Sequence, residues 1–212
     1  DLTGIKKRGG DYVEAALAEL MGDAKLVGSV VQTWLEHGQD RPTLVFAVNR
    51  AHAAALQREF EGHGVAAAYV DGFTDRIERE LISDQFRRGE VRVICSVRTM
   101  TTGVDLPVSC IVDAAPTASE MLHVQKIGRG LRVNEGTEDC LILDHAGNTL
   151  RLGKVTDIRY DELDKSKPGQ PSTGAKSDKV QAACSACATV FSGLVCPTCG
   201  KEKKQPPNTV LT

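Results

Sequence analysis

Residues 43–49 read TLVFAVN, and this stretch decides the fold class because it joins a strand to a helix. The apolar run over 43–48 contains β-branched and aromatic side chains and shows no polar face, which is typical of a strand covered on both sides. Asn49 is a good N-cap, so a helix is predicted over 50–62. The inward positions of that helix are Ala53, Leu56 and Phe60. A buried strand leading directly into a helix indicates an α/β protein.

The same alternation continues on both sides of this stretch. Further strands are predicted at 65–70, 91–96, 109–115 and 140–144, and further helices at 24–37, 75–88 and 119–132. The helix at 75–88 carries its apolar residues at Ile77, Leu81 and Phe86. Repeated strand–helix units with short connections predict a three-layer domain, a parallel sheet with helices on both faces. Ligands bind at the carboxyl edge of such a sheet, where Asn49, Asp71, Ser96 and Asp144 are expected to gather.

Charge is distributed unevenly over the 212 residues. Seven lysines against two acidic residues give residues 165–212 a net charge of +5, so residues 1–164 carry −7 of the total of −2. A basic tail on an acidic body indicates an anionic partner, with nucleic acid the first candidate, and a solvated flexible tail is the open alternative. The sequence contains no apolar run long enough to cross a membrane, so we expect a cytoplasmic protein with no membrane partner.

Composition suggests where the chain divides. Residues 165–180 are rich in Lys, Ser, Pro and Gly and read as a flexible linker. The predicted division is 1–23 as the end of a preceding domain or an interdomain segment, 24–164 as the α/β domain, 165–180 as the linker, 181–204 as a metal-binding module and 205–212 as a tail.

The seven cysteines divide at the same place. Cys95, Cys110 and Cys140 lie in predicted strands and are expected to pack as small core residues. The remaining four form two Cys-x-x-Cys pairs, Cys184 with Cys187 and Cys196 with Cys199. Two such turns close a tetrahedron of thiolates, so the pattern favours a structural zinc ribbon or knuckle with Phe191 as its core residue. Disulfides and rubredoxin-like iron are the alternatives.

Residues 125–132 read QKIGRGLR and place Arg129 and Arg132 three positions apart beside a glycine. The planar guanidinium fork matches phosphate oxygens, and at i and i+3 of a helix both forks can point the same way. A pair of solvated surface arginines is the alternative. Residues 99–107 read TMTTGVDLP and gather hydroxyls, a glycine and a carboxylate after a predicted strand. Taken alone, that second stretch is also compatible with an ordinary turn that carries a local side-chain cap.

These two stretches resemble motifs VI and V of superfamily 2 helicases. TLVFAVN resembles motif IV, and Gly72 with Arg79 resembles the segment that follows it. Four matches occur in the order of the family over residues 43–150, so the chain is similar to the second RecA-like domain of such a helicase. In finer detail GDY, PTASEMLHVQKIGRGLR, LDHAGN and the terminal cysteines are similar to RadD-type DNA repair helicases of bacteria and phages.

The resemblance implies roles for individual residues. Arg132 is implied as the arginine finger on the ATP γ-phosphate, with Arg129 beside it and Gln125 near the attacking water. The residues implied at the nucleotide edge are Gly103, Asp105 and Gly128. Those implied on the nucleic-acid side are Thr101, Thr102, Asn49 and Arg50. The resemblance implies ATP with Mg as cofactor and single-stranded or forked DNA as partner, with RNA as the open alternative.

The sequence also departs from the family. Neither a Gly-x-x-x-x-Gly-Lys-Ser/Thr loop nor an Asp-Glu box occurs in these residues, and those elements hold the β-phosphate and magnesium. We therefore expect a piece of a longer enzyme, inactive alone, that meets an N-terminal RecA-like domain across the ATP site. The alternatives are a non-catalytic zinc-bearing binding module on a degenerate RecA-like fold, and the motor portion of a restriction translocase.

Overall fold

The computed structural model describes residues 2, 4–97, 105–132, 138–158, 182–191 and 193–202. The chain divides into two compact units, Asp1–Asn148 and Thr149–Thr212, and each is described by itself.

A five-stranded sheet forms the centre of the first unit. Its strands are β3 (Thr43–Phe46), β4 (Ala67–Val70), β5 (Val93–Ser96), β6 (Cys110–Asp113) and β7 (Leu141–Asp144). They lie in the order β4-β5-β3-β6-β7, and every neighbouring pair is parallel. The predicted parallel α/β fold is confirmed, although the strands are shorter than predicted. Strand β3, for example, stops before Val48, because the Val48 amide donates to the ring of His52.

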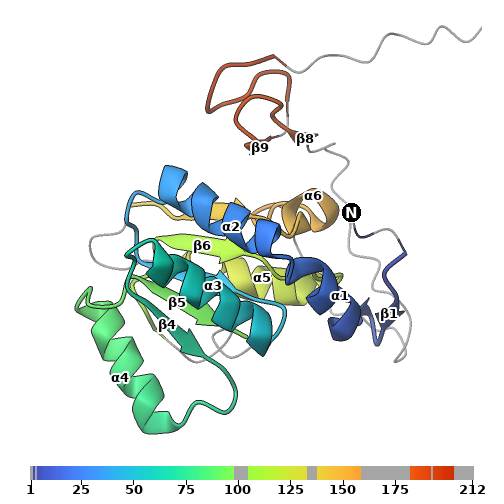
Figure 1. Cartoon of the computed structure of the whole chain (residues 1–212). Coiled ribbons are helices and arrows are strands. Elements are labelled where there is room, and N and C mark those ends of the chain that lie inside the picture. Colours follow the sequence, from blue (N-terminus) through green and yellow to red (C-terminus); the bar gives the residue numbers. More distant parts are fainter. Residues whose placement is uncertain are drawn as a thin grey trace, which may run out of the picture. The chain divides into compact units, whose positions relative to one another are not determined.

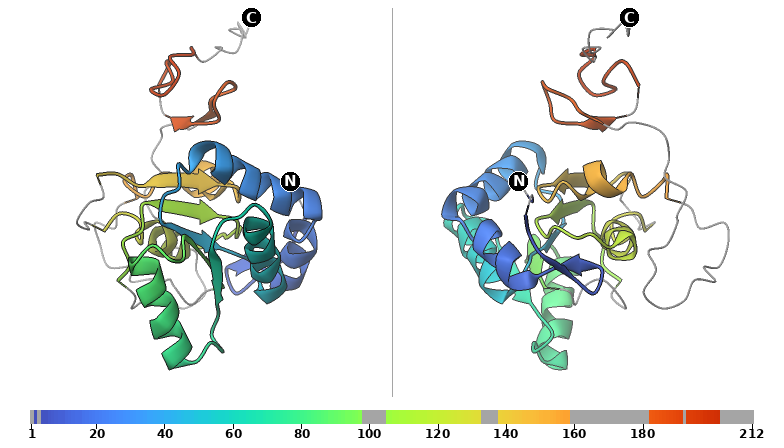
Figure 2. Two further views of the ribbon diagram at one scale, coloured as in Figure 1. Left: turned by 60° about the vertical axis from the view of Figure 1, so that its left-hand side comes forward. Right: turned by 90° about the vertical axis from the view of Figure 1, so that its right-hand side faces the viewer.

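Helices cover both faces of this sheet. They are α1 (Glu14–Met21), α2 (Ala24–His37), α3 (Arg50–Gly62), α4 (Arg76–Arg87) and α5 (Glu120–Ile127), and a short helix α6 (Asn148–Leu152) begins at the end of the unit. Helices α2 and α3 lie on one face and α5 on the other (Figures 1 and 2). A two-residue antiparallel ladder joins β1 (Lys7–Arg8) to β2 (Asp11–Tyr12) ahead of α1. This arrangement is the three-layer architecture that the sequence predicts.

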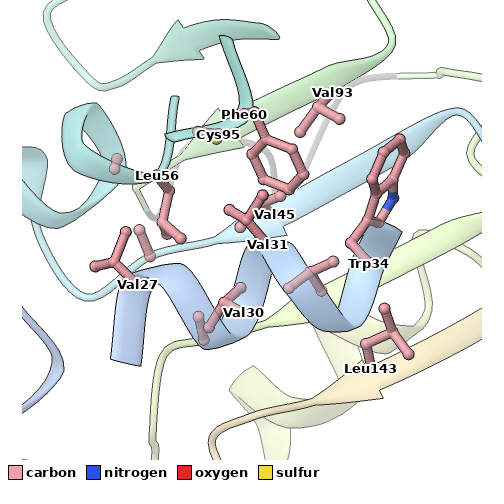
Figure 3. Close-up of a cluster of buried hydrophobic side chains, with 14 of the residues drawn as sticks. Val27, Val30, Val31, Trp34, Val45, Leu56, Phe60, Val93, Cys95 and Leu143 are labelled. Carbon is pink, nitrogen blue, oxygen red and sulfur yellow. The ribbon is translucent and has the colours of Figure 1, made fainter. Parts of the chain in front are cut away.

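The main core lies between the sheet and helices α2 and α3 (Figure 3). Trp34 of α2 meets Phe60 of α3 edge to face, with ring centroids 5.4 Å apart. The Trp34 indole also donates to the Thr43 hydroxyl over 2.7 Å, so its polar atom is satisfied in the core. The inward positions predicted for α3, which include Phe60, are all buried as expected.

Helix α4 buries only one of the three apolar residues that the sequence analysis noted on it. Ile77 and Leu81 are 80% and 53% exposed, and the buried residues are Ile82, Ser83 and Phe86. The physical reason is Arg79, whose guanidinium donates to the carbonyls of Asp71 and Thr74 and holds that side of the helix against the body. Of the three apolar residues noted on this helix, Ile77 and Leu81 therefore lie outside the core and Phe86 lies in it.

In the second unit the described cysteine segment is a small antiparallel element. Strand β8 (Ala182–Ala183) pairs with β9 (Val190–Phe191), and Val195 forms a bridge with Glu202. Phe191 is 3% exposed and packs with Cys184 and Cys196, which confirms its predicted place in the core of this segment.

Candidate functional site

The stretch Gln125–Arg132 begins on helix α5 and leaves it halfway. Ser119 caps the helix by accepting from the Leu122 amide, and the helix ends at Ile127. Gly128 is the C-cap, and its amide donates to the Val124 carbonyl over 2.8 Å. The predicted helix over 119–132 is therefore too long, and the two arginines lie on the turn that follows.

A close approach explains why the chain turns there. A Cβ added at Gly130 would overlap the Sγ of Cys140 and would lie 3.0 Å from Cγ1 of Ile111. The backbone at Gly130 thus packs directly onto β6 and the residue before β7. No larger side chain fits without displacing one of these neighbours, so Gly130 fixes the path of the arginine turn.

The two arginines of this turn have opposite environments. Arg129 is 7% exposed, and its burial, together with the charge of Arg132, lowers its pKa. Arg132 keeps 42% of its side chain exposed, and its Nη1 lies 3.4 Å from Oδ1 of Asp105. The backbone of Asp105 is held from α4, because Arg87 donates to its carbonyl over 3.0 Å. The structure thus brings Asp105 and Arg132 together, while the predicted residues Thr101, Thr102 and Gly103 lie outside the described residues.

Beneath this turn lies a buried ionic network that the sequence analysis missed. Lys126 Nζ donates to Asp113 Oδ1 over 2.6 Å and to the Ala115 carbonyl over 2.7 Å. Asn148 donates to the other Asp113 oxygen over 2.8 Å and accepts from the Thr117 amide over 2.9 Å. The Lys126 and Asp113 side chains are 3% and 0% exposed. Because Gln125 adjoins Lys126 and is itself exposed, the network holds α5 in place while Gln125 faces outward.

The segment before α1 joins the same network. Asp11 accepts from the Thr117 hydroxyl and from the Ala118 amide, each over 2.7 Å. These two residues directly precede the Ser119 cap of α5. Asp11 therefore links the N-terminal ladder to the start of the helix that carries Gln125. The sequence signal for this link is Asp11 within the GDY stretch, to which the resemblance assigns no role.

A second cluster lies where β3 and β4 end. Asn49 caps α3 by accepting from the His52 amide over 2.8 Å, as predicted. Arg50 Nε lies 2.7 Å from Oδ2 of Asp71, a carboxylate whose side chain is 5% exposed. The hydroxyl of Tyr69 donates to Asp71, and this bond, with amide bonds from the following turn, lowers the pKa of Asp71. The His52 amide and the Asp71 carboxylate thus hold Asn49 and Arg50, respectively, at the carboxyl edge.

The four cysteines of the second unit come together as the spacing predicts. Their Sγ atoms all lie within 4.8 Å of one another. Cys184 Sγ lies 3.5 Å from Cys199 Sγ, and Cys187 Sγ lies 3.6 Å from Cys196 Sγ. A tetrahedral zinc with Zn–S bonds of about 2.3 Å requires sulfur separations of roughly 3.8 Å. The donor set and its spacing therefore fit a four-thiolate metal ion.

Backbone amides support these sulfurs. The Ala186 amide lies 3.4 Å from Cys184 Sγ, and this bond together with one from the Cys187 amide lowers the pKa of Cys184. The Gly200 amide donates to the Cys196 carbonyl and closes the second turn. At Cys184 the lowered pKa favours the thiolate, which is the form that binds metal.

Comparison with known proteins places this geometry in a family. The model of the helicase conserved C-terminal domain matches residues 25–134, just over half of the chain. The putative ATP-dependent helicase IRC3 of Saccharomyces cerevisiae is 34% identical over 172 residues, which are 77% of this chain and 25% of the yeast protein. A 51.5 kDa protein of a Lactococcus phage is 26% identical over 206 residues, which are 95% of this chain and 45% of the phage protein. The chain thus spans less than half the length of these relatives.

Solved structures agree on the fold. The E. coli DEAD-box protein SrmB, solved bound to regulator of ribonuclease activity A, superposes with a TM-score of 0.52 at 21% identity, covering 63% of this chain and 78% of that one. The C-terminal domain of the DEAD-box protein Dbp5 gives a TM-score of 0.51 at 21% identity and covers 59% of this chain and 73% of that one.

No helix in the described part of the chain has the length and apolarity that a membrane span requires. The cytoplasmic location stays a prediction. The family match covers strands β3 to β6 of the sheet, the Asp105–Arg132 contact and the Gln125–Arg132 stretch, and the chain therefore belongs to the helicase conserved C-terminal domain family.

Proposed function

We propose that this chain is the second motor domain of an ATP-dependent DNA helicase or translocase and supplies the arginine fingers of a composite ATPase site. The observation that carries this proposal is the contact between Arg132 and Asp105, which lie 27 residues apart and belong to the stretches that resemble motifs VI and V. Family membership of the domain supports the same reading.

The environments of the two arginines support a division of roles. Arg132 is half exposed, and its distance of 3.4 Å from Asp105 leaves a weak ion pair that a phosphate can replace. Arg129 is nearly buried, so it supports the turn and offers only its outer edge to a ligand. We assign Arg132 as the finger, Arg129 as its neighbour, and exposed Gln125 as the group that orients the attacking water.

ATP with Mg would be held mainly by an N-terminal RecA-like domain. ATP supplies the phosphoryl group, and on this chain Gly103, Asp105 and Gly128 form the nucleotide edge. Domain closure would bring Arg132 to the developing phosphate charge, where its fixed positive charge stabilises the transition state.

The nucleic-acid side of the proposal rests on Thr101, Thr102, Asn49 and Arg50. Arg50 is 65% exposed beyond its contact with Asp71 and can meet a phosphate. The Oδ1 of Asn49 is used in capping α3, so its Nδ2 is the group offered to the strand. DNA is the favoured partner and RNA the alternative. A role in DNA repair or phage DNA metabolism, of the RadD type, is supported by the quoted stretches and by the phage relative that matches 95% of the chain.

The finger assignment is tested by Arg132→Ala in the full-length protein. An arginine finger contributes on the order of 10³ to 10⁵ in rate, so ATP turnover should fall nearly to background. The matched control is Arg88→Ala, because Arg88 pairs with Glu90 on the surface and lies far along the chain from the arginine turn. A variant Arg132→Ala that keeps most of its turnover would show that the finger is another residue.

The second unit is proposed as a structural zinc module held by Cys184, Cys187, Cys196 and Cys199. Metal analysis of the purified chain should give one zinc per chain, and Cys199→Ser should lose it. Cys140→Ser, in the first unit, should keep it. Iron in place of zinc, or no metal, would overturn the zinc assignment without touching the proposal for Arg132.

A further inference from the structure

The turn between β4 and α4 exposes a phenylalanine. Phe73 is 82% exposed, the highest exposure among the large hydrophobic residues of the structure's described part. It follows Val70, the last residue of β4, by three positions, so it lies at the carboxyl edge of the sheet. An exposed aromatic ring forfeits the stabilisation that burial brings, and at this edge of the sheet the ring is open to contact by a ligand.

The turn that carries Phe73 is held in place from several sides. Asp71 Oδ1 accepts from the Phe73 amide over 2.8 Å and from the Thr74 amide over 2.9 Å. The Thr74 hydroxyl accepts from the Asp71 amide over 2.9 Å. Arg79 donates to the carbonyls of Asp71 and Thr74 over 3.1 and 3.0 Å. These hydrogen bonds fix the backbone of the turn, and the fixed backbone holds the Phe73 ring at the surface.

The Arg50 guanidinium lies over this ring. Its guanidinium carbon lies 5.0 Å from the centroid of Phe73, within cation–π distance. The same guanidinium is anchored by its Nε to Asp71, the residue that holds the Phe73 amide. One buried carboxylate therefore positions both the ring and the cation.

We infer that Phe73 and Arg50 form a stacking platform for one unpaired nucleobase, with Arg50 meeting the adjoining phosphate. This inference rests on the proposed function, and it names Phe73 as a contact to single-stranded nucleic acid. Base stacking on an exposed aromatic ring beside a cation is how sequence-tolerant single-strand binding is built, because every base offers a π face. The nucleotide whose base stacks on such a ring also presents a backbone phosphate, which the arginine fork matches.

The competing occupant is an apolar protein surface. Ile77 and Leu81 follow Phe73 at four-residue spacing and are also exposed, so an apolar partner helix would use all three residues. The stacked and anchored guanidinium favours nucleic acid, because a charged fork beside the ring costs desolvation against an apolar partner and gains a salt link with phosphate. The two occupants predict different responses to substitution.

The test is the affinity of the 212-residue chain, purified in the presence of zinc, for a fluorescein-labelled oligo-dT strand, followed by fluorescence anisotropy at low salt. Phe73→Ala should weaken binding about 5- to 150-fold, the loss typical of one stacked base. Phe73→Leu keeps apolar bulk without the ring and should weaken binding similarly, whereas Phe73→Tyr should retain it. Ile77→Ala is the matched control and should bind as the parent chain does.

Fluorescence quenching gives a second readout, which reports on base stacking directly and not on affinity. The chain has one tryptophan, Trp34, which is 3% exposed in the core. Phe73→Trp adds an exposed indole, and stacking of a base on it should quench its fluorescence when oligo-dT is added. Because Phe73 is exposed, none of these variants should lower the thermal midpoint of unfolding.

The outcomes separate the inference from the proposed function. Binding by the parent chain that Phe73→Ala and Phe73→Leu leave unchanged overturns the platform but not the motor domain. Equal losses of oligo-dT affinity from Phe73→Ala and Ile77→Ala, with the affinity of Phe73→Leu retained, would show that apolar bulk and not ring stacking makes the contact, and would also overturn the platform. Absence of binding by the parent chain, with ATP turnover of the full-length protein still dependent on Arg132, overturns the platform and leaves the finger assignment intact.

Discussion

The carboxyl edge of the sheet has buried cations and exposed cations, and the two groups differ in their partners and in their contact with solvent. On the buried side, Lys126 is matched by Asp113 and the Ala115 carbonyl inside the protein. On the exposed side, Arg132 lies beside Asp105 and Arg50 beside Asp71, and the two arginines keep 42% and 65% of their side chains in solvent. The difference indicates that the buried cation stabilises the fold and that the exposed cations are available to a ligand. Substitutions on the buried side should cost folding free energy, and those on the exposed side should cost ligand binding or turnover.

The largest effect on stability is expected from Lys126→Met. It leaves the Asp113 carboxylate buried without its cation, and breaking a buried pair in this way costs about 3–5 kcal/mol. The measurement is urea unfolding followed by the fluorescence of Trp34, which reports on the first unit because it is part of that core.

The double variant Asp113→Asn with Lys126→Met is the control for charge. It removes both charges and should recover part of the loss, since no unpaired charge then remains. If Lys126→Met alone leaves the urea midpoint unchanged, the ionic network does not hold α5, and the contrast between the two sides fails.

A smaller effect is expected from acid. Burial lowers the pKa of His52 to about 4, and its Nε2 has no hydrogen-bond partner in the described part of the structure. Between pH 6.5 and 4 the unfolded chain binds a proton that the folded chain does not. Stability should therefore fall as pH drops, by about 2 kcal/mol from pH 7.5 to 5 for this residue.

His52→Asn sharpens that measurement, because asparagine keeps an acceptor near the Val48 amide and does not titrate. The variant should lose about 2 kcal/mol less than the parent over the same pH change. An identical pH dependence in the two proteins would show that His52 accepts its proton without cost.

The smallest effect is expected at Asn49, which caps α3 and is also proposed to contact nucleic acid. Asn49→Ala removes the cap of α3 and should cost about 1 kcal/mol. Asn49→Ser keeps a capping oxygen and should recover most of this stability, yet it lacks the amide donor proposed for nucleic acid. Urea unfolding measures the capping role in each variant, and oligo-dT binding measures the role in ligand binding. If Asn49→Ser recovers both stability and binding, Asn49 acts through the cap alone.

Much of the fold was predictable because short stretches of the sequence specify its strands and helices. The apolar run at 43–48 and the cap at Asn49 indicated the central strand and α3, and repetition of that pattern indicated the parallel sheet. The helix over 119–132 was overextended because periodicity does not register the close packing of Gly130 on Ile111 and Cys140. The exposed face of α4 was missed because Arg79, a residue outside the apolar pattern, sets its orientation.

The candidate site was predictable only in its motif residues. The cysteine spacing predicted a cluster whose sulfurs do converge, because two short turns leave little freedom. The partners of Lys126 come from β6 and from Asn148, and no local pattern connects residues so far apart in the sequence. Phe73 was missed for a different reason, since a phenylalanine is ordinarily assigned to the core.

Arg129→Ala and Arg132→Ala, compared in the full-length protein by ATP turnover and thermal midpoint, test the central claim most directly. Arg132→Ala should lose nearly all turnover, on the order of 10³-fold or more, with its midpoint unchanged. Arg129→Ala should lower the midpoint, because it removes a side chain that is 7% exposed. A stable Arg129→Ala protein without turnover, beside an active Arg132→Ala protein, would contradict the account.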